Sequence, residues 1–228
     1  WLVKLDTKGK IEWQKVFGGT YVDELRSVCL TADGGYFIGG YSNSPLSGNK
    51  SQDNIGVGDY WVLKLDSKGE IQWQKTIGGD RDDQLYAVRQ TYDNGYLIGG
   101  NSNSNNSYQK SKGNDDGTDF WVVKLNDKGE SVWQETYNIA KTDILSSIVE
   151  NEDHSFLLAG YAQAEANTSA KKGISNKSSI KDGTADYVAI RITEKGEEVW
   201  RSVLGSHGED FLKKAIETRD GGYLLAGT

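Results

Sequence analysis

The sequence has little of three residue types, and each shortage limits what the protein can do. A single cysteine, Cys29, excludes an intrachain disulfide and a Cys-x-x-Cys metal site within these 228 residues. Two histidines, His154 and His207, belong to no catalytic or zinc-binding motif, and neither a phosphate-binding loop nor a serine nucleophile elbow occurs. We therefore predict that the chain is not an enzyme and holds no histidine-based metal centre.

Long apolar runs and clustered basic residues are also missing. Hydrophobic residues make up 36% of the chain, and no run approaches the roughly 20 apolar residues that a membrane-spanning helix needs. The formal net charge is −7 and the basic residues are scattered, whereas nucleic-acid-binding proteins usually present a clustered basic face. Neither a transmembrane segment nor a nucleic-acid partner is expected.

Internal repetition dominates what the sequence does contain. The segment Asp59–Leu65 returns as Asp119–Leu125 and again, less closely, as Asp186–Ile192, which gives a period of about 60 residues. Each copy continues through a short turn into a strand with a tryptophan, a glycine-rich link with an aspartate, a further strand, a tight turn and a last strand ending in two small residues. The repeats cover approximately residues 1–59, 60–118, 119–185 and 186–228, within one domain or segment.

The repeat predicts an all-β fold. Each copy holds four short strands of β-branched and aromatic residues, separated by glycine turns. Packing four-stranded antiparallel blades face to face around an axis buries both faces of each sheet, so we predict a β-propeller. The chain would begin with the two outer strands of a blade and end with the two inner strands. Residues 211–228 could then pair with residues 1–16 in a closed four-bladed ring; alternatively the chain is an arc of a larger propeller, which the missing Asp-Tyr before Trp1 favours.

Turn chemistry supports the hairpins and gives the blade two different ends. His154 occupies the tight-turn position that Gly34, Asn94 and Gly221 take elsewhere, so a positive φ is expected at all four residues. Because strands alternate in direction within a blade, the tight hairpins should emerge on one face of the molecule. The long loops and the aspartate-containing links should emerge together on the other face.

Two sets of repeated residues suggest chemistry but are better explained by structure. The tryptophans could form a sugar-stacking platform, yet packing between blades accounts for their recurrence. The link aspartates could suggest glycoside hydrolysis, but that reaction needs two carboxylates in different protonation states, and equivalent settings give no such asymmetry. We expect these aspartates to cap backbone N–H groups. The structural repeat positions are Trp13, Trp73, Trp133, Trp200, Asp23, Asp83, Asp143 and Asp210.

The repeat breaks down in three long loops, residues 41–58, 101–118 and 161–185, which are rich in Ser, Asn, Gly and Lys. Variable loops on a rigid scaffold are common binding surfaces, although this composition also suits solvated spacers. The candidate binding residues are Asn103, Asn105, Tyr108, Lys110, Lys171, Lys172 and Lys177. No cofactor is expected; calcium is the one metal that the loop oxygens suit, with Asp53, Asp115 and Asp116 as weak candidates.

The strings DYWVLKLDSKGEIQWQKTIGG and TYDNGYLIGGNSNS resemble the repeats of large bacterial surface proteins with propeller-like arrays. Such arrays are common in cargo proteins of type IX secretion, where they often precede a C-terminal sorting domain. The resemblance covers essentially the whole chain. It implies a β-propeller that is secreted or displayed on the surface of a Gram-negative bacterium, and it implies no reaction.

These observations favour a non-catalytic surface module that binds a glycan or a protein through the long-loop face. One alternative is a structural repeat segment of a larger secreted or adhesin protein, with flanking domains that carry the function. A second alternative is a propeller enzyme of the lyase or lactonase type. Its only support is a set of non-repeated charges on the predicted innermost strands: Arg89, Glu150, Lys213, Lys214 and Glu217.

Overall fold

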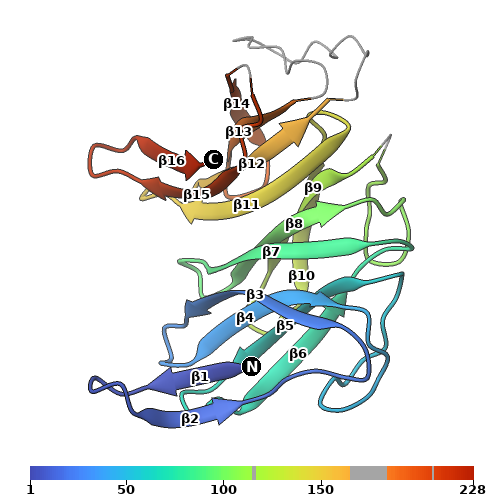
Figure 1. The fold of residues 1–228 in the computed structure, drawn as a ribbon, viewed down its shortest axis with the longest axis vertical. Helices are drawn as coiled ribbons and strands as arrows, with labels where there is room; N and C mark the ends of the chain where they lie inside the picture. The colour runs from blue at the N-terminus through green and yellow to red at the C-terminus, as the bar shows by residue number, and fades with distance from the viewer. Residues whose placement is uncertain (115–116, 165–183, 207) are drawn as a thin grey trace.

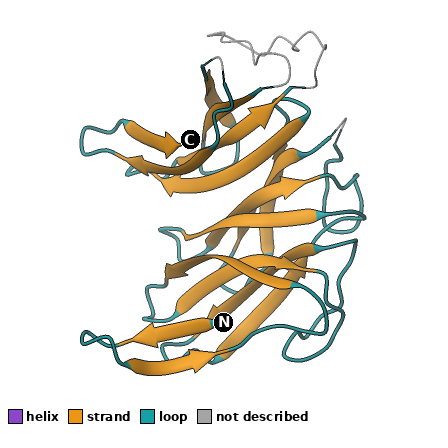
Figure 2. Cartoon of the chain, in the orientation of Figure 1, coloured by secondary structure: helices purple, strands orange, loops and turns teal. Residues whose placement is uncertain are grey.

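A computed structural model describes residues 1–114, 117–164, 184–206 and 208–228. The described part is built from strands and connecting loops (Figure 2). The strands of the first half are β1 (Leu2–Leu5), β2 (Ile11–Lys15), β3 (Asp23–Leu30), β4 (Tyr36–Ser42), β5 (Asp59–Leu65), β6 (Ile71–Ile77), β7 (Asp83–Gln90) and β8 (Tyr96–Ser102). Those of the second half are β9 (Asp119–Leu125), β10 (Ser131–Tyr137), β11 (Thr142–Glu150), β12 (Phe156–Gln163), β13 (Ala185–Ile192), β14 (Glu198–Leu204), β15 (Leu212–Glu217) and β16 (Tyr223–Gly227). Across these residues, we find no helix that could cross a bilayer.

The strands form three four-stranded antiparallel sheets and two two-stranded ones (Figure 1). We call the complete sheets blade A (β3–β6), blade B (β7–β10) and blade C (β11–β14). The pairs β1–β2 and β15–β16 are the N-terminal and C-terminal half-blades. The prediction of an all-β fold with repeated four-stranded antiparallel sheets is therefore confirmed.

The first strand of each blade packs against the next blade. Strands β3, β7, β11 and β15 follow one another from blade to blade, as predicted for the innermost strands. The tight hairpins emerge at the left of Figure 1, and the long loops and links of blades A and B emerge at the right. The positive φ values of the shared turn position are 80° at Gly34, 63° at Asn94, 64° at His154 and 78° at Gly221.

The half-blades do not complete each other. Strand β16 pairs with β15, strand β1 pairs with β2, and no pairing joins β16 to β1 in the described chain. Trp1 is 74% exposed, whereas the equivalent Trp61 in blade A is 1% exposed. The sheets are compatible with propeller blades, but the closed four-bladed ring that the sequence allowed is not present.

Tryptophans hold neighbouring blades together. Trp73 on β6 of blade A contacts Tyr96 on β8 of blade B, with ring centroids 5.6 Å apart. It also packs beside Gly129, the turn glycine of blade B, where an added Cβ would lie 2.8 Å from the indole. Trp61 is buried within blade A and donates its indole N–H to Gln74 at 3.0 Å. The repeated tryptophans thus have packing and hydrogen-bonding roles inside the repeat.

Candidate functional site

The long loops of blades A and B are bound to the glycine-rich links by their own polar side chains. In blade A, the N–H groups of Thr20, Tyr21 and Val22 donate to Ser47, Ser44 and Asn43 at 3.0, 2.8 and 2.9 Å. The same three bonds recur in blade B, where residues 80–82 donate to Ser107, Ser104 and Asn103. The Ser- and Asn-rich composition therefore has a structural cause in these two loops, since each repeated side chain satisfies a backbone donor.

The repeated link aspartates cap the backbone in every repeat. Their Oδ2 atoms accept N–H bonds from the residue four positions earlier, at 2.7 Å for Asp23 and Asp83, 2.8 Å for Asp143 and 2.6 Å for Asp210. Burial raises the pKa of Asp83 and raises that of Asp143 further. The bonds are the capping interactions that the repeat predicts; Asp83 and Asp143 are buried, and Asp23 and Asp210 are half-buried.

Three of the predicted binding residues have internal partners in the structure. Asn103 accepts the Asp82 N–H at 2.9 Å, and Asn105 donates to both carboxylate oxygens of Asp80. The prediction that Lys110 belongs to a binding surface is corrected by the structure, because its side chain is fully buried. Its ammonium donates to the carbonyl of Lys112 at 2.6 Å and to Asn114 at 2.9 Å, and burial lowers its pKa.

Tyr108 is the predicted binding residue that the structure presents to solvent. It is 76% exposed and has a φ of 48°, at the position where blade A has Gly48 with a φ of 58°. A bulky side chain in the left-handed region costs about 1–2 kcal/mol. The blade B loop therefore carries an exposed aromatic ring at a position where its backbone would favour glycine.

The remaining predicted residues are placed as follows. Lys171, Lys172 and Lys177 lie outside the described residues, as do the calcium candidates Asp115 and Asp116. Asp53 uses one carboxylate oxygen to accept the Leu46 N–H at 2.7 Å. Within residues 1–114, 117–164, 184–206 and 208–228, no group of three or more His, Cys, Asp or Glu side chains is arranged to hold a metal ion.

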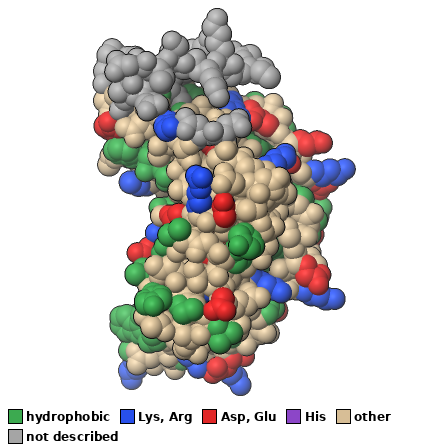
Figure 3. Space-filling view, turned by 90° about the vertical axis from the view of Figure 1, so that its right-hand side faces the viewer, with side chains coloured by type: hydrophobic (Ala, Val, Ile, Leu, Met, Phe, Trp, Pro, Cys, Tyr) green, Lys and Arg blue, Asp and Glu red, His purple; other side chains and the backbone are tan. Residues whose placement is uncertain are grey.

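Among the described residues, the long-loop face has a mixed surface without a dominant charge. Figure 3 shows this face with hydrophobic, basic and acidic side chains in small, separate groups on a mainly tan background. Exposed apolar side chains recur in its loops and links: Tyr21, Val22, Leu46, Val57 and Tyr108.

Each first strand has a β-bulge at the same place, near the long-loop end. The register shifts between Leu25 and Ser27 in β3 and between Leu85 and Ala87 in β7. Equivalent shifts occur in β11 and β15. The bulged residue differs in every repeat: Arg26, Tyr86, Ser146 and Lys213. Bulges often redirect a side chain at a functional site, and residues that break a repeat are not needed by the repeat itself.

Arg26 and Tyr86 join at these bulges to form a cluster across blades A and B. The Arg26 guanidinium lies 4.4 Å from the centroid of the Tyr86 ring and 5.7 Å from that of Tyr41. It donates two bonds to Glu24, at 3.0 and 2.6 Å, and one to Gln84 at 3.2 Å. We call Glu24, Arg26, Tyr41, Gln84 and Tyr86 the axial cluster.

The axial cluster is chemically suited to recognition. Arg26 and Tyr86 are half-buried, so their planar groups are held in place while part of each remains accessible. Tyr86 donates its hydroxyl to Gln84 at 3.0 Å, which fixes the ring further. Planar aromatic and guanidinium groups with adjacent amide and carboxylate oxygens can bind both the apolar faces and the hydroxyls of a sugar.

The charges considered for an enzyme do not converge in the same way. Arg89 is exposed at the tight-turn end of β7, and Glu150 accepts the Tyr92 N–H at 3.0 Å. Lys213 lies over the Phe211 ring at 5.8 Å. Lys214 is exposed and Glu217 is half-buried on β15. These contacts give no nucleophile–base pair and no paired carboxylates.

Comparisons with known proteins add little to this picture. No family model matches the chain, and no curated protein matches it. A crystal structure of a protein of unknown function from Bacteroides caccae resembles it with a TM-score of 0.39 and 12% identity, covering 96% of this chain and 75% of that one. A likeness of this strength carries no argument about function.

Proposed function

We propose that this protein is a non-catalytic binding module of the β-propeller type that recognises a glycan through its long-loop face. The proposal includes a secreted or cell-surface location in a Gram-negative bacterium, in keeping with the repeat resemblance. The observation that carries it is the axial cluster, in which residues that break the repeat bring an arginine onto two tyrosine rings at a pair of equivalent bulges. Tyr108 is a further exposed aromatic residue in the long loops.

A glycan array followed by calorimetry on the best ligand tests this function. Arg26→Ala and Tyr86→Ala should each weaken binding tenfold or more, about 1.4 kcal/mol, because each removes half of a stacked pair. Arg89→Ala is the matched control on the same strand as Tyr86, and its affinity should be unchanged. If the screen finds a specific protein ligand and no glycan, the partner recognised by this face is a protein instead of a glycan. Equal affinity of all three variants and the parent would place the binding site elsewhere.

A structural repeat segment of a larger surface protein is the second candidate, and the half-blades favour it. Leu224 on β16 is 57% exposed, although the equivalent Leu97 and Leu157 are fully buried. Under this proposal the exposed half-blades pair with further repeats of the same kind. Light scattering should then show concentration-dependent association that Leu224→Ser reduces, together with an empty glycan screen. A strictly monomeric chain would count against it.

A further inference from the structure

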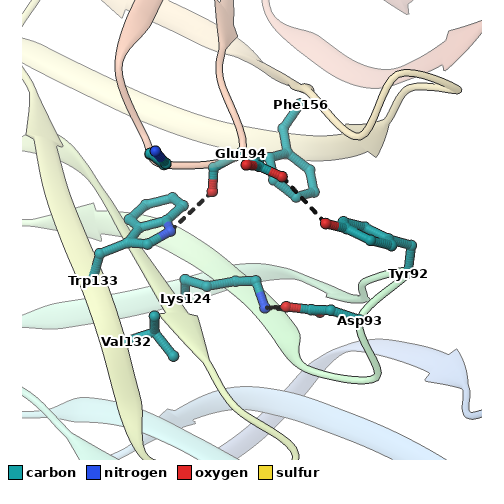
Figure 4. A pocket seen from close by; sticks show the side chains of 8 residues that line it. Tyr92, Asp93, Lys124, Val132, Trp133, Phe156 and Glu194 are labelled. Atoms are coloured by element: carbon teal, nitrogen blue, oxygen red, sulfur yellow. Dashed lines mark hydrogen bonds and ion pairs between the residues drawn. The ribbon is translucent and has the colours of Figure 1, made fainter.

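A recess lies between blades B and C, on the tight-turn side of the molecule and away from the axial cluster. It is a pocket of about 240 Å³. Figure 4 shows Trp133 and Tyr92 on opposite sides of it, with Phe156 and Glu194 along one edge and Lys124 and Asp93 along the other. Two aromatic side walls and polar edges are the general make-up of a small-ligand site.

The pocket occurs where the repeat changes. At the equivalent junctions, Trp13 contacts Tyr36, Trp73 contacts Tyr96 and Trp200 contacts Tyr223, with ring centroids 5.6, 5.6 and 6.1 Å apart. At the junction of blades B and C, the corresponding Trp133 and Phe156 line the pocket. The wall facing Trp133 is Tyr92, at a turn position that Ala32, Glu152 and Arg219 occupy in the other repeats.

Tyr92 is held in place by three residues of blade C. Its ring stacks on that of His154 from the next tight turn, with centroids 3.6 Å apart and an interplanar angle of 20°. Its hydroxyl donates to Glu194 at 3.2 Å, and its N–H donates to Glu150 at 3.0 Å. A side chain that is 55% exposed thus has two fixed contacts, and its backbone has a third, so the wall is formed before any ligand arrives.

The opposite wall and the edges are fixed as well. The Trp133 indole N–H donates to the Glu194 carbonyl at 3.0 Å, which links blade B to the outer hairpin of blade C. The Lys124 ammonium donates to both oxygens of Asp93, at 3.0 and 2.8 Å. With Glu194 and Lys195, the pocket has two acidic and two basic side chains. Because these charges balance, a neutral ligand is favoured over a phosphate or an ammonium group.

We propose that this pocket is a carbohydrate subsite that takes one neutral pyranose ring between Trp133 and Tyr92. The C–H faces of the sugar would lie against the two rings, while its hydroxyls would meet the Glu194 carboxylate, the Asp93 carboxylate and the ammonium of the exposed Lys195. These groups include both acceptors and a donor, as sugar hydroxyls require. The site goes beyond the proposed function, since it lies on the other face of the molecule and shares no residue with the axial cluster.

The test is a titration of the full chain with the methyl glycosides of neutral hexoses, followed by the NMR signal of the Trp133 indole N–H. A saturable shift at millimolar concentration is expected, because one sugar ring offers few atoms for binding. Tyr92→Ala should weaken binding tenfold or more. Arg26→Ala should leave it unchanged, which separates this site from the axial cluster. Tighter binding of choline or a sugar phosphate, or no saturable shift, would overturn the proposal.

Two further variants separate a lost contact from a lost fold. His154→Asn keeps a residue that tolerates a positive φ, as Asn94 shows at 63°, but removes the ring behind Tyr92. Its affinity for the sugar should fall several-fold while its urea midpoint stays near that of the parent. Glu152→Ala changes the Tyr92-equivalent position of the next turn and should alter neither quantity. Unchanged affinity of both His154→Asn and Tyr92→Ala would exclude this pocket as the site.

Discussion

The Gly100→Ala substitution is expected to destabilise the protein by about 3 kcal/mol or more. This is among the largest losses expected from any glycine-to-alanine substitution in the chain. An added Cβ would lie 1.9 Å from the carbonyl oxygen of Gln84 and 2.7 Å from the Cα of Leu85. Both atoms belong to the backbone of β7, which is bonded to β8 along its length. No side-chain rotation can relieve this clash, so the strands must separate locally. Urea unfolding followed by tryptophan fluorescence measures the loss.

The preceding glycine provides a matched control. An added Cβ at Gly99 would meet side-chain atoms, the closest being Cδ2 of Leu145 at 2.6 Å. Ala159 and Ala226 occupy the equivalent position in the third and fourth repeats, so the fold accommodates a methyl group there. Gly99→Ala should therefore cost less than about 1.5 kcal/mol. Similar losses in the two variants would show that the Gln84 carbonyl can move.

Gly100 also connects the fold to the candidate site. It pairs with Leu85, and Gly99 pairs with Ala87, so the bulged Tyr86 lies between these two pairs without a partner of its own. In blade A, Arg26 likewise lies between the pairs Leu25–Gly40 and Ser27–Gly39, and a Cβ added at Gly40 would lie 1.7 Å from the Glu24 carbonyl oxygen. The glycines in the middle of β4 and β8 allow the backbone of the neighbouring bulged strand to come close. Loss of that close approach should displace Tyr86 from the Arg26 guanidinium.

Much of the fold follows from local signals. Repeated strands alternate with glycine turns, and residues such as Asn94 and His154 occupy positions of positive φ, so the sequence predicts the hairpins and the two ends of the blade. Ring closure could not be predicted, because the same half-blades suit either a closed ring or an open arc. The pairing of β1 and β16 depends on the curvature of the whole array, which no single repeat encodes.

The candidate sites were harder to predict, for two physical reasons. A bulge adds one residue without changing the residue types around it, so Arg26 and Tyr86 look like ordinary strand residues that follow a repeated leucine. The signal that could have revealed them is the variation at one position beside the invariant Leu25, Leu85, Leu145 and Leu212. In the long loops, Asn and Ser suggested free polar groups, yet Asn103 satisfies a backbone donor and Lys110 is buried.

The ionisation of Asp59 should make the folded protein less stable as the pH rises from about 4 to 6. Its side chain is buried at the start of β5, where it accepts the Ile55 N–H at 2.6 Å and the Gly56 N–H at 3.3 Å. Burial raises its pKa to about 6, the nearby Asp83 adds to the rise, and Lys50 opposes it. The folded state therefore holds a proton that the unfolded chain releases near pH 4. The unfolding free energy falls across this window, by up to about 3 kcal/mol for a shift of about two pKa units.

Asn at position 59 cannot ionise, so the Asp59→Asn variant should lose most of this decrease between pH 4 and 6. A smaller decrease remains, because burial also raises the pKa of Asp83 and of Asp143. Asp33 gives a control of opposite sign: its bonds to Lys64 and Thr31 lower its pKa to about 2, so its stabilising effect is lost only as the pH falls below about 4. Asp33→Asn should therefore flatten the acid side of the profile and lower stability evenly above about pH 4, without changing the slope between pH 4 and 6. Urea midpoints measured from pH 3 to 8 separate the two windows, and parallel profiles for Asp59→Asn and the parent would show that the pKa of Asp59 is the same in the folded and unfolded states.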